Sequence, residues 1–247
     1  PGRVLRRVCA GRLLDDLDIR GAIVRLDEVW QARLAADPPD LVAVAGDVTA
    51  AGAPEAAVAF RSKLDHSRLP CRLIPGNSDL RNPAGQAAVL QALAGPPVAD
   101  HPACRVVMLD TGDGEISSDT RRMAEQATAG AGDRALVIVM HFPPEVLAPD
   151  SRQWCEAWVR QARPSLIVAA HSHRDRVYDW AGVPVQMVRG LDPDKAIGGP
   201  PAVSLFTLQD GRWRRRDLSF PDGTAAGWSV AEREELGALL GLGCSRD

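Results

Sequence analysis

Short apolar runs alternate with segments of helical periodicity through the first two thirds of the chain, and this alternation limits the folds it can adopt. Strands are expected at 40–45, 70–74, 104–110, 135–140 and 165–170. Helices are expected at 23–36, 54–65, 85–94, 118–128 and 154–162. Such alternation is typical of α/β folds that contain parallel sheets. The final third differs, because Gly, Pro and Asp turns there separate expected strands at 176–180, 184–188, 203–208 and 212–218.

The C-terminal segment is expected to close the fold with a helix. Ser229 and Glu232 have the spacing of a capping box and precede an apolar set that ends at Leu240. The sequence has no internal repeat, and the Gly and Pro cluster at 198–201 is too short to separate two units that fold alone. We therefore expect one domain over residues 1–247.

Composition excludes several functional classes. The chain has 247 residues, of which 45% are hydrophobic, so it can bury a sizeable core. Its net charge of −3 gives no cationic excess, which makes nucleic acid an unlikely partner. No apolar run approaches the roughly 20 residues of a membrane helix. The five cysteines form no CxxC pair, which favours a reducing cytoplasm over a disulfide framework. The oligomeric state stays open.

Four of the apolar runs end in a residue that can bind a metal ion. These endings are Asp47 after LVAVA, Asn77 after CRLIP, His141 after LVIVM, and His171 with His173 after LIVAA. Ligands of α/β sheets bind beyond the carboxyl ends of the strands, so we expect these side chains to form one site. Gly46 and Gly76 precede Asp47 and Asn77, as expected where a tight turn leaves room for an ion or a phosphate.

The residue types at these endings favour a transition metal. Carboxylate, amide oxygen and imidazole together suit Mn, Fe or Zn better than Mg or Ca. His171 and His173 would project to the same side of an extended chain and contact one ion or two adjacent ions. Two such ions, about 4 Å apart, orient a phosphoryl group and activate water, so phosphoester hydrolysis is the expected reaction.

The order of four short motifs along the chain resembles that of a known superfamily. GD, GN-x-D, H-x-P-P and H-x-H, each after an expected strand, are similar to the calcineurin-like metallophosphoesterase superfamily. The sequence Leu109-Asp110-Thr111 also resembles a stretch of its cyclic-nucleotide phosphodiesterase members. The resemblance runs from about Leu41 to Arg174 and implies a four-layer α/β/β/α sandwich of two mixed sheets flanked by helices.

The resemblance also implies roles for individual residues. The metal ligands it implies are Asp47, Asn77, His141, His171 and His173. Asn77 and His141 are also expected in the catalytic group together with Asp79. Asp79 either orients Asn77 or a ligand histidine, or is an exposed turn carboxylate.

Three departures from the family pattern affect the expected chemistry. Residues 4–13 lack the D-x-H motif that normally supplies most of one metal site, and Cys9 is a candidate for the position of its aspartate. Ser78 replaces the histidine of the GNH motif that protonates the leaving group, and Ala170 replaces a glycine. One ion is therefore expected rather than two, with Asp15, Asp16 and Asp18 left open as replacement ligands.

Two main functions stay open on the sequence. The first is a divergent metal-dependent phosphohydrolase that cleaves a small phosphodiester or phosphomonoester with metal-activated water. The second is an impaired relative that binds a phosphorylated ligand or a protein partner, with Arg6, Arg7 and Arg12 near the missing motif as anion-binding groups.

A third interpretation, nucleic-acid processing, depends on four arginines around Trp213. These arginines are Arg212, Arg214, Arg215 and Arg216. Strand alternation divides them between two faces, so we favour a solvated edge strand at this position.

Overall fold

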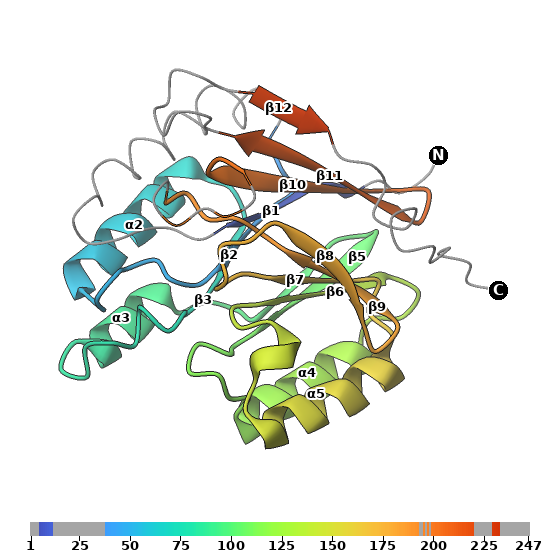
Figure 1. Ribbon diagram of the computed structural model, residues 1–247, viewed down its shortest axis with the longest axis horizontal. Helices are drawn as coiled ribbons and strands as arrows, with labels where there is room; N and C mark the ends of the chain where they lie inside the picture. Colours follow the sequence, from blue (N-terminus) through green and yellow to red (C-terminus); the bar gives the residue numbers. More distant parts are fainter. Residues whose placement is uncertain are drawn as a thin grey trace.

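The computed structural model of the protein describes residues 5–11, 38–192, 195, 197, 199–219 and 229–232. Within these residues the strands form two six-stranded sheets (Figure 1). The first sheet has the order β12 (Ser229–Glu232), β11 (Arg212–Ser219), β10 (Ala202–Gln209), β1 (Leu5–Gly11), β2 (Leu41–Ala45) and β3 (Cys71–Ile74). The second has the order β4 (Val98–Asp100), β5 (Cys104–Leu109), β6 (Ala135–Met140), β7 (Leu166–Ala169), β9 (Val183–Met187) and β8 (Arg176–Trp180).

Helices cover the outer faces of the two sheets (Figure 1). These are α2 (Pro54–Ser67) and α3 (Gln86–Leu93) on the first sheet, and α4 (Ser118–Ala129) and α5 (Pro149–Ala162) on the second. Ala43 of β2 and Val139 of β6 lie in the core between the sheets. On the outer faces, Val44 packs with Phe60 of α2, and Trp158 of α5 packs with the second sheet. The predicted four-layer sandwich is therefore confirmed.

Each sheet contains three parallel neighbouring strands, and the segments after their carboxyl ends are the part of the fold that concerns the predicted site. β1, β2 and β3 are parallel neighbours in the first sheet, as are β5, β6 and β7 in the second. All five residues of β2 are buried, because helices cover one face of this strand and the second sheet covers the other. The segments that follow the carboxyl ends of β2, β3, β6 and β7 carry the predicted site residues.

Local sequence sets where the helices begin. Pro54 and Pro149 lie in the first turns of α2 and α5, where a missing backbone N–H costs no helical hydrogen bond. The α5 helix therefore begins at Pro149, earlier than the predicted start at Trp154. Ser117 caps α4, since its side chain accepts a hydrogen bond from the backbone N–H of Thr120.

Two strand assignments near the C-terminus correct the sequence predictions. The helix predicted to begin at Ser229 is wrong at its start, because Ser229–Glu232 forms β12 and pairs with β11. Backbone pairing with a neighbouring strand outweighs the local capping signal there. The strand of the four arginines is not an edge strand, since β11 lies between β10 and β12. Arg212 and Arg214 are exposed, as alternation predicts, but Arg215 is buried.

Some predictions are not addressed by these residues. The predicted helix at 23–36 and the residues after 232 lie outside the described part of the chain. The strand β4 was not predicted from the sequence, and it pairs antiparallel with β5. No helix in the described ranges has the length and apolar character needed to cross a membrane.

Candidate metal centre

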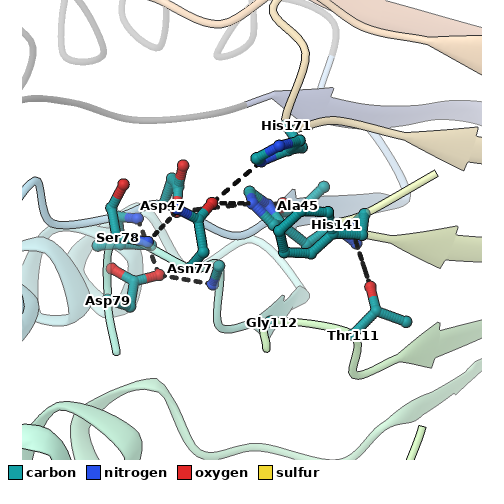
Figure 2. A network of polar contacts seen from close by, with 12 residues as sticks. Ala45, Asp47, Asn77, Ser78, Asp79, Thr111, Gly112, His141 and His171 are labelled. Atoms are coloured by element: carbon teal, nitrogen blue, oxygen red, sulfur yellow. Dashed lines mark hydrogen bonds and ion pairs between the residues drawn. The ribbon is translucent and has the colours of Figure 1, made fainter. Parts of the chain in front are cut away.

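Four of the five predicted ligands come together where the two sheets meet (Figure 2). Asn77 lies at the centre, with its Oδ1 atom 3.0 Å from Nε2 of His141 and 3.0 Å from Nδ1 of His171. Asp47 adds a carboxylate, whose Oδ1 atom lies 3.6 Å from Nε2 of His141. Loops that follow strands of both sheets thus bring side-chain oxygen and nitrogen atoms together in one small region.

The ring of His141 is held in one orientation. It is fully buried, and its Nδ1 atom lies 2.8 Å from the carbonyl oxygen of Ala45. A carbonyl oxygen only accepts, so Nδ1 is the donor, and in the neutral ring Nε2 carries the lone pair. That lone pair faces the side-chain oxygens of Asn77 and Asp47. This arrangement suits a cation shared by the three groups.

The backbone around His141 is held by a residue to which sequence reasoning gave no role. The Oγ1 atom of Thr111 accepts hydrogen bonds from the backbone N–H groups of His141 at 3.1 Å and Phe142 at 3.0 Å. Phe142 in turn packs against His171, with ring centroids 4.0 Å apart. Thr111 follows β5 just as the predicted ligands follow their strands, so its position after a strand was the available signal.

The segment with the two C-terminal histidines is not extended. His171 has a φ of 63° and His173 a φ of 55°, so the expected same-side projection along an extended chain is wrong. His171 contacts Asn77, whereas His173 lies two residues farther on, where its carbonyl oxygen accepts a hydrogen bond from the N–H of Ile197 at 2.8 Å. Ala170 does not adopt a positive φ, so its replacement of glycine needs no strained backbone.

Asp79 is a buried carboxylate that joins the two loops after β2 and β3. Its oxygens accept hydrogen bonds from the N–H groups of Val48, Thr49 and Gly76 and from the hydroxyl of Thr49, at 2.6–3.2 Å. The alternative of an exposed turn carboxylate is therefore wrong. Burial raises the pKa of Asp79, and the hydrogen bonds from Gly76 and Thr49 oppose that rise. The contacts make Asp79 a positioning residue for both loops.

Glycine is required where these loops approach each other. A Cβ atom on Gly76 would overlap Oδ1 of Asp47 and would lie 2.7 Å from Cε1 of His141. A Cβ atom on Gly46, whose φ is 87°, would lie 2.7 Å from Nδ1 of His141. The absence of a Cβ atom at both glycines therefore lets the loops after β2 and β3 approach His141 closely.

The donor set fits a divalent transition metal. Within the described ranges, no group of three or more His, Cys, Asp and Glu side chains is arranged to hold a metal ion, so the convergence depends on the amide oxygen of Asn77. One carboxylate, one amide oxygen and two imidazoles are the ligand types that Mn, Fe and Zn accept. The assignment of Asp47, Asn77, His141, His171 and His173 as ligands stays a prediction.

The first strand lies beside this centre without the expected motif. β1 pairs in parallel with β2, and the backbone of Cys9 is opposite Val42, the second residue of β2. The side chain of Cys9 lies outside the described part of the chain, so its assignment to the aspartate's position stays a prediction. Asp15, Asp16, Asp18 and Arg12 lie outside the described residues, as do the side chains of Arg6 and Arg7.

Comparison with known sequences identifies related proteins. A sequence profile described as calcineurin-like phosphoesterase matches residues 18–175, a range that includes every predicted ligand. Glycerophosphodiester phosphodiesterase GpdQ of Enterobacter lignolyticus (strain SCF1) is 30% identical over 135 residues. That match covers 48% of this chain and 47% of the relative, so the chain spans about half the length of this curated relative.

Solved structures with low sequence identity share the fold. GAP50 of Plasmodium matches with a TM-score of 0.61 at 10% identity, over 94% of this chain and 90% of that one. TT1561 of Thermus thermophilus matches with a TM-score of 0.55 at 15% identity, over 92% of this chain and 99% of that one. At these identities the likeness shows the fold alone.

Proposed function

The chain belongs to the calcineurin-like phosphoesterase family, and on this premise we propose that it is a metal-dependent phosphohydrolase that cleaves a phosphodiester or a phosphomonoester. One observation carries the proposal. The amide oxygen of Asn77 lies 3.0 Å from a ring nitrogen of both His141 and His171, beside the carboxylate of Asp47. This proximity of a carboxylate, an amide oxygen and two imidazoles from both sheets supports a site for metal-assisted hydrolysis.

In this proposal the ion is held by Asp47, Asn77, His141 and His171, with His173 contributed by the same loop as His171. A bound divalent metal supplies Lewis acidity, which activates water and neutralises charge on the phosphoryl group. The chain's own groups set the geometry: Ala45 fixes the tautomer of His141, and Thr111 fixes its backbone. One ion of Mn, Fe or Zn is proposed, because β1 contributes neither Asp nor His.

The replacement of the GNH histidine by Ser78 bears on the substrate. Ser78 is fully buried, and its backbone N–H donates to Oδ1 of Asp47 at 2.7 Å. A serine hydroxyl is a weak acid, so leaving groups that need little protonation are favoured. The name of the relative GpdQ makes glycerophosphodiesters the first natural class to assay. We propose a small phosphorylated substrate and a cytoplasmic location, the latter supported by cysteines without CxxC spacing.

The second candidate is binding without hydrolysis. It is supported by the sequence of β1, Leu-Arg-Arg-Val-Cys-Ala-Gly, which lies directly beside β2 without a carboxylate or imidazole. Such a protein would retain a phosphorylated ligand or a protein partner at the same edge of the sheets. Hydrolysis separates the two candidates, because only the first consumes the ester.

The deciding experiment measures metal content and hydrolysis in the same preparations. Elemental mass spectrometry is applied to protein purified without chelator and again after Mn²⁺ loading, with His141→Ala as the deficient variant and His66→Ala as the matched control. The three proteins are then assayed with bis-(p-nitrophenyl) phosphate, p-nitrophenyl phosphate and a glycerophosphodiester. Metal and hydrolysis that are lost in His141→Ala alone support the hydrolase. Tight metal without hydrolysis supports the binding protein, and no metal in the unmodified protein contradicts the metal site.

A further inference from the structure

A cluster of four buried charged side chains adjoins the segment that carries His171 and His173. We name it the arginine–aspartate cluster; its members are Asp175, Arg189, Arg215 and Asp217. All four side chains are at most 3% exposed, and their formal charges cancel. Burial of charged groups costs desolvation free energy, so we asked which parts of the chain these four side chains hold in place.

Arg215 is the centre of the cluster. Its Nη1 atom donates to Oδ1 of Asp175 at 2.8 Å. Its Nε and Nη2 atoms donate to the two oxygens of Asp217 at 2.7 Å and 2.9 Å. Arg189 adds a second donor to Asp217 at 2.8 Å. One guanidinium therefore joins two carboxylates with directional hydrogen bonds, which fixes their relative position more closely than a point charge can.

The cluster joins the two sheets. Asp175 precedes β8 of the second sheet, and Arg215 and Asp217 lie on β11 of the first. Ser204 of β10 donates to Asp217 at 3.0 Å, and Gln186 of β9 donates to Asp175 at 3.4 Å. Asp175 is thus the member of the cluster that belongs to the chain segment of the predicted histidine ligands.

That histidine segment needs an external support. His171 and His173 both have positive φ, a conformation that side chains other than glycine seldom adopt and that surrounding contacts must maintain. The backbone supplies part of the support, because Ile197 donates to the carbonyl of His173 at 2.8 Å and accepts from the N–H of Asp175 at 3.2 Å. The side chain of Asp175, two residues after His173, is held by the hydrogen bond that Arg215 donates to it at 2.8 Å.

We propose that Asp175 and Arg215 are positioning residues that hold His171 and His173 in the geometry for binding a divalent transition metal. The proposal rests on the proposed function in one respect, since it takes the two histidines as ligands. A buried charge cluster often adds little net stability compared with apolar side chains. What it provides in this proposal is a set of hydrogen bonds of fixed direction, which hold Asp175 in one position. Loss of groups that orient metal ligands typically weakens metal binding about 10–100-fold.

The test uses a double variant that keeps the cluster electrically balanced. Asp175→Asn/Arg215→Gln removes one charge of each sign and leaves the pair of Arg189 and Asp217. The matched control is Asp100→Asn/Arg105→Gln, which removes a charge pair joined at 2.7 Å on a different part of the second sheet. Amide hydrogen exchange of residues 170–176 is measured in the absence of metal, and Mn²⁺ affinity is measured by titration calorimetry.

We expect faster exchange at 170–176 in the cluster variant, unchanged exchange in β6 and β7, and Mn²⁺ binding weakened about 10–100-fold. The control should match the unmodified protein in both readouts. If the double variant does not fold, Arg215→Lys keeps the charge and loses the planar fork, and it should show the same changes to a smaller degree. Unchanged exchange at 170–176, or an equal increase throughout both sheets, would overturn the proposal. A local exchange response in a protein that never binds Mn²⁺ would instead contradict the metal site and leave the positioning role in place.

Discussion

The Nδ1 atom of His141 lies 2.8 Å from the carbonyl oxygen of Ala45, so the residue after β6 in one sheet donates to the last residue of β2 in the other. The contact turns the opposite ring nitrogen toward Asn77 and Asp47. It also satisfies a buried backbone acceptor at the junction of the sheets. One imidazole thus serves the fold and the proposed metal site together.

Replacement of His141 tests both roles. We expect His141→Ala to lose metal-dependent hydrolysis and about 1–3 kcal/mol of the free energy of unfolding, because the carbonyl of Ala45 loses its buried donor. His66→Ala is the control, since His66 is exposed on α2 and its substitution should change stability by less than about 0.5 kcal/mol. Urea denaturation and hydrolysis assays measure the two effects. Full retention of metal in His141→Ala would contradict its assignment as a ligand.

Gly76 provides a test of the close packing around the ligands. An added methyl group would overlap both Oδ1 and the backbone nitrogen of Asp47, so Gly76→Ala must displace the Asp47 loop. We expect a loss of about 1–3 kcal/mol in stability together with weakened Mn²⁺ binding. Gly95→Ala is the matched control, because its new methyl group meets only Arg61 at 3.9 Å. Equal behaviour of the two variants in denaturation and metal titration would refute this interpretation.

The sequence predicted that these strand endings lie close together, because a simple rule of topology governs their positions. Parallel strands with polar residues at their carboxyl ends had to bring Asp47, Asn77, His141 and His171 to one edge. The conformation of the histidine segment could not be predicted, because positive φ at His171 is maintained by contacts with residues remote in the chain.

Two further predictions, for Arg215 and Ser229, differ from the structure for the same reason, because contacts with residues remote in the chain decide both. Arg215 resembled a surface residue because an arginine in a strand is usually solvated, and only the tertiary structure provides its partners Asp175 and Asp217. Ser229 carried a helix-capping pattern, yet the backbone of β11 offered it a strand partner. Local patterns predicted which residues lie together, whereas contacts with residues remote in the chain determine which strands pair and which arginine is buried.

Asp79 is predicted to act through the loops that it holds. Asp79→Asn replaces one acceptor oxygen by an NH₂ donor that would face backbone N–H groups of Val48, Thr49 or Gly76. We expect a loss of about 1–3 kcal/mol in unfolding free energy and weakened metal binding. The exposed Asp113 provides the control variant Asp113→Asn. A stable Asp79→Asn protein with normal metal affinity would show that the carboxylate is not needed to position the loops.

Thr111 offers a test in which a conservative variant should restore function. Its buried hydroxyl accepts from the N–H groups of His141 and Phe142, and valine has nearly the same shape without an acceptor. Thr111→Val therefore leaves two buried donors unsatisfied, and we expect a loss of about 1–3 kcal/mol with slower hydrolysis. Thr111→Ser retains the hydroxyl and should recover most of the hydrolysis rate. If valine retains the rate and serine reduces it, the methyl group matters rather than the hydrogen bonds, and the orientation of His141 does not depend on Thr111 Oγ1.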